Sequence, residues 1–195
     1  GQRMREVFKV TAITMRRNAL YQHITASSND HRLLGAVGKE SRLFKVAKAA
    51  APTVTGVYMP LSGCGRFTCY VGLEQRAPGM AKQVALAVLG ADIYTKTVIV
   101  LDHDIDLTDD SEVLWAIATR VQFDRDVHLI SGARGSDLDP SVSEDGIVCK
   151  TIIDATAKPT LNDFKPRAVV PDEVWDRINL DDYLPGVKKV SELSA

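Results

Sequence analysis

Apolar residues recur along the chain with two periods, and these predict alternating strands and helices. Short apolar runs bounded by turn residues predict strands at 7–15, 54–59, 68–74, 98–101, 127–131 and 148–153. Longer stretches at helical spacing predict helices at 30–50 and 78–90, a helix that begins after Asp109, and a short helix within 171–178. Strands with apolar interiors that alternate with helices favour an α/β fold, with a mixed sheet covered by helices.

The helix predicted over 30–50 has an apolar side. The residues on its main stripe and beside it are Leu33, Val37, Phe44, Leu34, Leu43 and Ala47. Gly35 and Gly38 lie inside this helix, where each glycine costs up to about 1 kcal/mol relative to alanine. We therefore expect the two glycines to allow close packing of the helix on a neighbour.

The helix predicted over 78–90 has a characteristic residue at each end. Pro78 is expected at the first helical position, where its fixed φ is already suitable, and Gly90 is expected to end the helix.

The stretch 94–126 combines a strand, an acidic loop and a helix. Its buried run ends in carboxylates at Asp102, Asp104 and Asp106. Asp109, followed three residues later by Glu112, predicts a capping box at the start of the next helix. That helix should carry Val113, Leu114, Ile117 and Val121 to the core. The loop at the carboxyl end of such a strand is where open α/β sheets tend to bind ligands.

Several motifs that carry chemistry in other proteins are incomplete in this chain. The three aspartates mimic the first half of a calcium loop, but Leu107 occupies the glycine position and Val113 the position of the bidentate glutamate. Loop hydrogen bonding is therefore the expected use of these carboxylates. The glycines around Cys64 lack a third glycine and are followed by a strand, so they are not a dinucleotide fingerprint. The four histidines show no HExxH spacing for zinc.

Composition narrows the class of protein. The chain has 195 residues, 24 basic and 25 acidic side chains and a net charge of −1, which gives no global field for nucleic acid. No apolar run is long enough for a membrane span. The three cysteines show no CxxC pairing, which favours idle thiols in a reducing compartment, and we expect a cytoplasmic protein.

Seven short motifs follow one another along the chain. They are VFKVTAIT followed by Arg16-Arg17, Asn29-Asp30-His31 with Leu34-Gly35, PLSGCG at 60–65, Pro78-Gly79-Met80-Ala81, the strand, acidic loop and helix of 94–126, the loop 132–140, and Lys150 with Asp154-Ala155-Thr156. In this order they resemble the C-terminal part of UbiD-type decarboxylases. These enzymes use prenylated flavin mononucleotide to remove CO2 from aromatic and α,β-unsaturated acids.

The resemblance implies an activity and its cofactors. It implies a reversible non-oxidative decarboxylase with prenylated FMN, a divalent metal (Mn or Mg) and potassium, bound mainly by an N-terminal flavin-binding domain. No segment here matches the family's E-x-P-x-(G)-E run, so the resemblance assigns no catalytic residue to this chain. Arg120 matches a position whose backbone carbonyl helps to hold potassium. The alternative is an arginine that faces the dipole of its helix.

The resemblance also implies which residues line the substrate pocket. Asp30 and Leu34 at the start of a helix, and Ser136 and Leu138 in the loop after the strand at 127–131, correspond to its substrate side. Bulky residues are common at the Ser136 position in relatives that act on aromatic acids. A serine there suggests a roomier or more polar pocket.

The sequence also predicts how the chain is organised. We expect residues 1–157 to form an α/β domain and 158–195 an extended tail with a short helix that docks on another domain or subunit. The chain does not begin with methionine, and a strand-like alternation starts almost at once. We therefore expect a piece of a longer protein. Its expected partners are its own N-terminal domain, further copies of itself as a homo-oligomer, and a small carboxylic acid. The alternative is a non-catalytic scaffold or assembly subunit that retains the fold.

Overall fold

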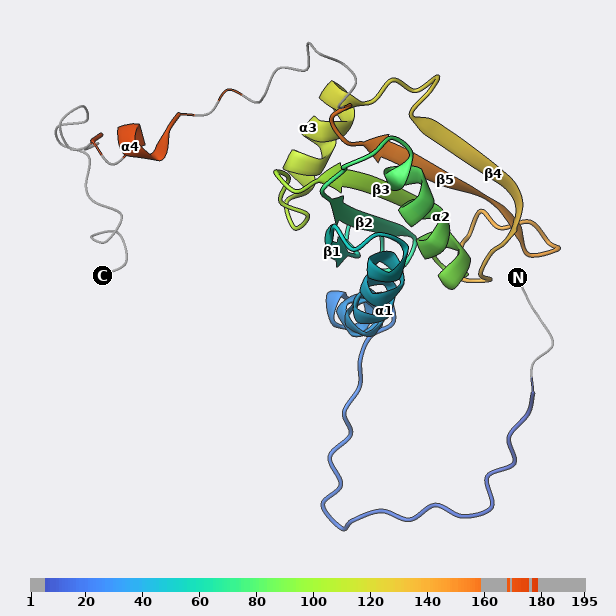
Figure 1. Cartoon of the computed structure of the whole chain (residues 1–195). Helices are drawn as coiled ribbons and strands as arrows, with labels where there is room; N and C mark the ends of the chain where they lie inside the picture. The colour runs from blue at the N-terminus through green and yellow to red at the C-terminus, as the bar shows by residue number, and fades with distance from the viewer. Residues whose placement is uncertain (1–5, 159–167, 169, 176, 179–195) are drawn as a thin grey trace. The chain divides into compact units, whose positions relative to one another are not determined.

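The computed structural model describes residues 6–158, 168, 170–175, 177 and 178 (Figure 1). Contacts divide the chain into two units, Gly1–Lys158 and Pro159–Ala195. The helices and strands of the first unit are α1 (Asn29–Ala50), β1 (Val54–Tyr58), β2 (Thr68–Leu73), α2 (Met80–Ala91), β3 (Thr97–Asp102), α3 (Asp110–Arg120), β4 (Val127–Arg134) and β5 (Ile147–Ala155). The second unit contains the short helix α4 (Asp172–Trp175).

The sheet of the first unit is mixed, as the sequence predicts. Its five strands lie in the order β1-β2-β3-β5-β4. The three central strands β2, β3 and β5 are parallel to one another, whereas β1 and β4 pair antiparallel at the two edges. The parallel strands are the ones that the helices cover, which explains their continuous apolar sequences.

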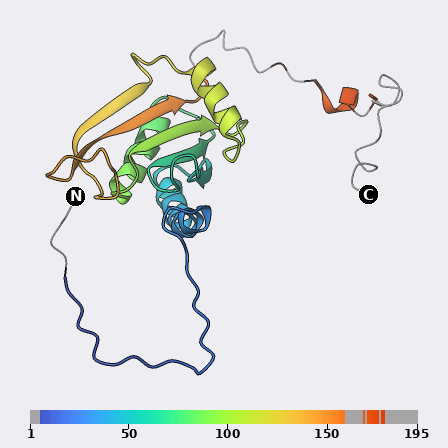
Figure 2. The same ribbon diagram turned by 180° about the vertical axis from the view of Figure 1, so that it is seen from behind.

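Helices cover both faces of the sheet (Figures 1 and 2). Side chains alternate along β3, so Val98 and Val100 join the cluster under α1 and α2, while Ile99 and Leu101 join the cluster under α3. Each face of the central strand therefore has its own core. Together these layers confirm the predicted α/β fold class.

Two of the predicted helix ends differ from the structure. Helix α2 begins at Met80, after Gly79 with a positive φ of 84°, so Pro78 lies before the helix. Gly90 lies inside α2, which ends at Ala91. The left-handed conformation of Gly79 explains the first difference, because it places the break in the chain one residue after the proline.

The start of α3 confirms one half of its predicted cap. The Asp109 carboxylate accepts a hydrogen bond of 2.8 Å from the Ser111 amide. The Glu112 carboxylate accepts a hydrogen bond from the amide of Asp106, at 2.9 Å. Of the predicted core residues, Val113 and Val121 are buried and Leu114 is exposed, because α3 presents a narrower face to the sheet than its spacing suggests.

The strand predicted over 7–15 is absent from the structure. The described residues 6–15 have no regular secondary structure, and the large apolar side chains Val7, Phe8, Val10, Ile13 and Met15 are exposed. A strand is stable only beside a neighbour, and none of the five strands pairs with this segment.

Helix α1 also leaves apolar residues uncovered. Leu43 and Ala47 are buried as expected, and so is Ala36. Leu33, Leu34 and Val37, in the first half of the helix, are 52%, 67% and 56% exposed. The predicted stripe is therefore buried in the second half of the helix, whereas its members in the first half are exposed.

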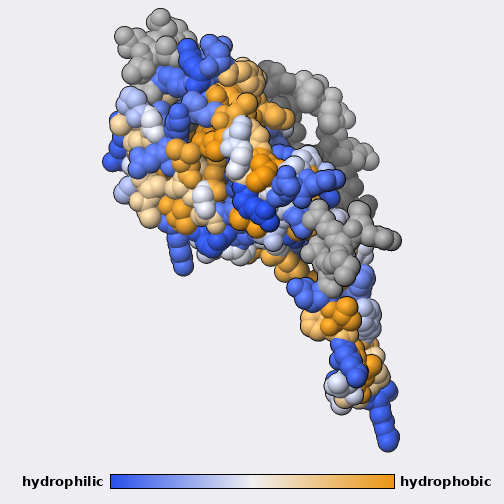
Figure 3. All heavy atoms as spheres, turned by 90° about the vertical axis from the view of Figure 1, so that its right-hand side faces the viewer, coloured by the Kyte–Doolittle hydropathy of each residue, from blue (hydrophilic) through white to orange (hydrophobic). Residues whose placement is uncertain are grey.

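Apolar side chains are exposed elsewhere in the first unit as well. Leu86 and Ile93 at α2, and Leu129 on β4, are examples. Figure 3 shows apolar residues gathered on one face and bordered by hydrophilic ones. No helix among the described residues is long and apolar enough to cross a membrane.

The second unit confirms a helix within 171–178, although α4 is only four residues long. The described apolar side chains Val174, Trp175 and Ile178 are exposed. Docking of this tail on another domain or subunit stays a prediction.

Candidate functional site

The start of α1 lies beside a cavity of about 240 Å³. Three segments that are distant in sequence line it. His31 and Arg32 come from α1, Cys64 and Arg66 from the turn between β1 and β2, and Leu138 from the loop after β4. The predicted pocket segments, the start of α1 and the loop 136–138, thus meet at one cavity.

Two glycines of the predicted motifs shape this cavity. A Cβ at Gly35 would lie 3.1 Å from Nη2 of Arg66, so this glycine gives the guanidinium room to lie against α1. Gly65 has a φ of +60°, and a Cβ there would lie 2.9 Å from the Arg32 carbonyl oxygen. The turn therefore packs directly on the helix, as predicted for Gly35. Gly38 has no neighbour within 4 Å of such a Cβ, so close packing is wrong for that residue.

Both ring nitrogens of His31 lie at hydrogen-bond distance from a neighbouring N–H group. The Ser27 backbone N–H donates to Nδ1 at 2.9 Å. Nη2 of Arg66 lies 3.4 Å from Nε2, and the roles in this contact depend on the tautomer of the ring. His31 thus connects the start of α1 to the turn that carries Arg66.

The arginines of the cavity lack the ion pairs that several other described arginines form. Arg42, Arg76, Arg120 and Arg125 form ion pairs with carboxylates there. Arg32 and Arg66 form none with any described residue, although both are half-buried. The cavity thus carries uncompensated positive charge next to the N-terminus of a 22-residue helix, whose dipole adds to it.

The four predicted pocket residues do not all lie at this cavity. Leu138 lines the cavity and is 57% exposed. Asp30 and Leu34 are exposed on α1 and do not line this cavity. The Ser136 residue is buried, and its hydroxyl accepts a hydrogen bond from the Leu138 amide at 3.1 Å. Ser136 therefore holds the turn that presents Leu138, and contact of the four residues with a substrate stays a prediction.

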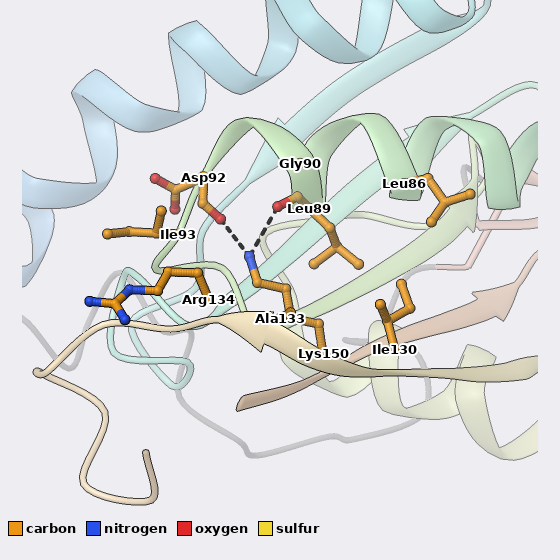
Figure 4. Close-up of a pocket in the computed structure, with 9 residues that line it drawn as sticks. All are labelled: Leu86, Leu89, Gly90, Asp92, Ile93, Ile130, Ala133, Arg134 and Lys150. Atoms are coloured by element: carbon orange, nitrogen blue, oxygen red, sulfur yellow. Dashed lines mark hydrogen bonds between the residues drawn. The ribbon is translucent and has the colours of Figure 1, made fainter. Parts of the chain in front are cut away.

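A second cavity, of about 330 Å³, lies between α2 and β4 (Figure 4). Leu86, Leu89, Ile93 and Ile130 contribute apolar side chains to it. Lys150 points toward the end of α2 and donates from Nζ to the carbonyl oxygens of Leu89, at 3.0 Å, and Asp92, at 2.7 Å. Burial lowers the pKa of Lys150. The amine satisfies carbonyls that the end of the helix leaves without partners, which is a structural role.

A buried ion pair lies at the carboxyl end of β3. Arg120 donates from Nη1 to Asp102 and from Nη2 to Asp104, at 2.9 and 2.6 Å. Asp102 also accepts from the Ala157 amide, which ties down the backbone two residues after β5. Burial raises the pKa of Asp102, whereas the hydrogen bond from Arg120 lowers the pKa of the more exposed Asp104.

This ion pair was not foreseen from the sequence. Neither the potassium role nor the dipole role predicted for Arg120 includes the two carboxylates. Arg120 is the last residue of α3, and its backbone carbonyl lies at the end of that helix. The potassium role of this carbonyl stays a prediction. The described residues contain no group of three His, Cys, Asp or Glu side chains placed to hold a metal ion.

Comparisons with known proteins agree with the fold and the motifs. Residues 32–155 match the model of the family described as 3-octaprenyl-4-hydroxybenzoate carboxy-lyase C-terminal domain. The chain therefore belongs to the UbiD family of decarboxylases, and it contains the family's C-terminal domain.

Relatives of known activity are found among curated proteins. The chain is 38% identical, over 77% of its length and 36% of the relative's, to anhydromevalonate phosphate decarboxylase from Methanothermobacter thermautotrophicus. It is 32% identical, over 84% of its length and 36% of the relative's, to gallate decarboxylase from Lactiplantibacillus plantarum. The chain thus spans little more than a third of the length of these relatives.

Solved structures show the same relationship. The UbiD-class enzyme HmfF from Pelotomaculum thermopropionicum, in complex with FMN, superposes with a TM-score of 0.78 and 38% identity. The match covers 87% of this chain and 38% of the HmfF chain. The 3,4-dihydroxybenzoic acid decarboxylase AroY from Klebsiella pneumoniae gives a TM-score of 0.75 and 31% identity, over 88% of this chain and 36% of its own.

Proposed function

We propose that this chain is the C-terminal, pocket-lining and oligomerisation portion of a reversible non-oxidative decarboxylase. Its substrates are aromatic or α,β-unsaturated carboxylic acids, and its cofactor is prenylated FMN. Family membership supports the reaction class, and the relatives include decarboxylases of aromatic acids and of a phosphorylated acid. A cytoplasmic location is part of the same proposal.

The observation that carries the proposal is the uncovered apolar surface beside the cavity. Leu33, Leu34 and Val37 are exposed on the same half of α1 that reaches the cavity, and the segment 6–15 exposes further large apolar side chains. Contiguous apolar surface on a protein usually marks an interface. We assign this surface to contact with the flavin-binding domain of the same protein, and the exposed residues of α2 and β4 to contact with another subunit.

The proposal divides the chemistry between two parts of the protein. Loss of CO2 leaves a carbanion, and the bound prenylated flavin supplies the electron sink for it. The residues of this chain bind and orient the acid. Leu138 presents an apolar wall, Ser136 fixes the position of that wall, and the cationic cavity attracts an anionic ligand.

Only one position in the described part of this chain is assigned to a metal ion. The Arg120 guanidinium is engaged with Asp102 and Asp104, so the carbonyl at the end of α3 is the group that would face potassium. The divalent ion is assigned to groups outside this chain, since the described residues provide no complete set of ligands.

The test is the activity of the full-length protein. The complete reading frame should encode an E-x-P-x-G-E run and an N-x-x-R flavin-site segment upstream. The protein expressed with prenylated FMN should release CO2 from at least one unsaturated acid, while the 195-residue chain alone should retain no flavin absorbance and release none. A reading frame without both segments, together with an inactive protein, would favour the scaffold subunit instead.

A further inference from the structure

We propose that Lys96 is a positioning residue for substrate selection. Its ion pair with Asp139 fixes the loop between β4 and β5, and this loop forms an apolar wall of the cavity beside α1. The inference rests on the proposed function, because it assigns a residue that sets the shape of the same pocket.

The loop presents two side chains to the cavity from either side of a buried carboxylate. Leu138 and Pro140 both line the cavity. Asp139, which lies between them in the chain, is buried and accepts a hydrogen bond from Nζ of Lys96 at 2.9 Å. Because the three loop residues share one backbone, a shift of Asp139 moves both of its neighbours. The position of the wall therefore depends on the contacts of Asp139.

Asp139 also organises the loop itself. Its Oδ1 accepts from the amide and the hydroxyl of Ser141, at 2.9 and 2.7 Å. Its own amide donates to the Ser136 carbonyl at 3.0 Å. These hydrogen bonds lie within the loop, so they fix its internal shape but not its place against the sheet. The ion pair between Oδ2 and Lys96 supplies that second restraint, and Nζ also donates to the Ser141 hydroxyl.

The backbone of Lys96 is anchored on both sides. The residue lies directly before β3, its amide donates to the Phe67 carbonyl, and its carbonyl accepts from the Thr151 amide, each at 2.8 Å. Phe67 itself lines the cavity. Lys96 therefore holds the loop in place relative to the sheet and to another wall of the same cavity.

The expected consequence concerns selectivity more than stability. Lys96 is half-buried, and an ion pair that solvent reaches contributes little to the free energy of unfolding. The position of a pocket wall has a larger effect, because a misfit of about one methylene changes kcat/KM roughly 10- to 200-fold. Loss of the ion pair should therefore alter which acids are accepted while the enzyme stays folded.

The test uses the full-length enzyme loaded with prenylated FMN and pairs of unsaturated acids that differ by one methyl group. For the pair that the wild type distinguishes most, Lys96→Met should bring the ratio of kcat/KM about 10-fold closer to 1, chiefly through KM of the better acid. Lys96→Arg should keep most of the wild-type ratio, because a guanidinium can still pair with the carboxylate. Lys45→Met, at an exposed position on α1, should leave kcat and KM unchanged.

Asp139→Asn tests the same ion pair from the other side. The amide can still accept from Ser141 through its oxygen, but it turns an N–H group toward Lys96. If the two residues act as one unit, the double variant Lys96→Met/Asp139→Asn should be no less selective than Lys96→Met alone, whereas independent effects would multiply. A wild type that distinguishes no pair, an unchanged ratio in Lys96→Met, or a multiplied loss in the double variant would overturn the inference.

A separate measurement distinguishes this inference from the proposed function. If no acid is decarboxylated, the proposed function fails, and hydrogen exchange of the full-length protein then decides on the ion pair. Lys96→Met should speed the exchange of the Leu138, Asp139 and Ser141 amides and leave the amides of β3 unchanged, while Lys45→Met should alter neither. Loop exchange that is equal in the two variants contradicts the inference.

Discussion

The two cavities described in the first unit use basic side chains in opposite ways. In the cavity between α2 and β4, Lys150 gives hydrogen bonds to two backbone carbonyls, and its charge is used inside the protein. In the cavity beside α1, Nη2 of Arg66 lies 3.4 Å from Nε2 of His31, and no described carboxylate pairs with the guanidinium. A basic group that is fully partnered holds the fold together, whereas one without a counter-charge is available to a ligand.

Arg120 belongs with Lys150 in this comparison. Its guanidinium binds two carboxylates at the end of β3, and Asp102 in turn holds the backbone after β5. Both residues should therefore affect stability, while Arg66 should affect binding. Substitutions that separate these two effects test the comparison directly.

The largest expected effect on stability is that of Arg120→Met. Removal of the guanidinium leaves the Asp102 carboxylate, which is 15% exposed, without its counter-charge. Breaking such a buried pair costs about 3–5 kcal/mol in the free energy of unfolding. Urea denaturation followed by circular dichroism measures it. The control, Arg76→Met, removes an exposed pair with Glu74 and should change stability little. Equal losses in the two variants would show that Arg120 is no more structural than a surface arginine.

The next effect in size is that of Lys150→Met, which removes both hydrogen bonds to the end of α2. We expect a loss of about 2 kcal/mol, since hydrogen bonds from a charged donor are lost while the methionine still fills the cavity wall. Lys48→Met is the matched control, because exposed Lys48 donates to the Pro52 carbonyl just after α1. If thermal unfolding showed the same small change for both lysines, the structural role of Lys150 would be refuted.

A smaller effect is expected from Asp109→Ala at the start of α3. The carboxylate satisfies the Ser111 amide, and loss of such a cap costs about 1 kcal/mol. Asp124→Ala, at an exposed position after the same helix, should leave the melting temperature unchanged. Identical melting curves for the two variants would mean that the cap contributes nothing.

The sequence alone predicted the elements whose apolar period agrees with their burial. Helix α1 and strands β1, β2 and β3 lie within one or two residues of the predicted ranges. The strand predicted over 7–15 failed for a physical reason, because alternation shows that a segment can form a strand but does not supply a neighbour. The same limit applies to the first half of α1, where apolar residues at helical spacing remain exposed.

The candidate site was predictable only in part. The resemblance identified the start of α1 and the loop 136–138, and the structure brings both to one cavity. Arg66 was not predicted, because nothing local distinguishes an arginine in a turn until Gly35 and His31 are placed beside it. One signal for Arg66 was available in the sequence. Gly35 and the glycine-rich turn at 60–65 belong to two of the recognised motifs, and these glycines allow the turn to pack on α1.

The central claim is that the loop presenting Leu138 faces the acid in the full-length enzyme. The direct measurement is kcat/KM for a panel of small and bulky unsaturated acids, with wild type, Leu138→Phe and, as a control, Leu114→Phe on the exposed side of α3. Leu138→Phe should lower kcat/KM of the bulky acids about 10- to 200-fold and spare the small ones, because added volume penalises only the substrates that need the space. Leu114→Phe should change none. A uniform change across the panel for Leu138→Phe, or no change at all, would contradict the account.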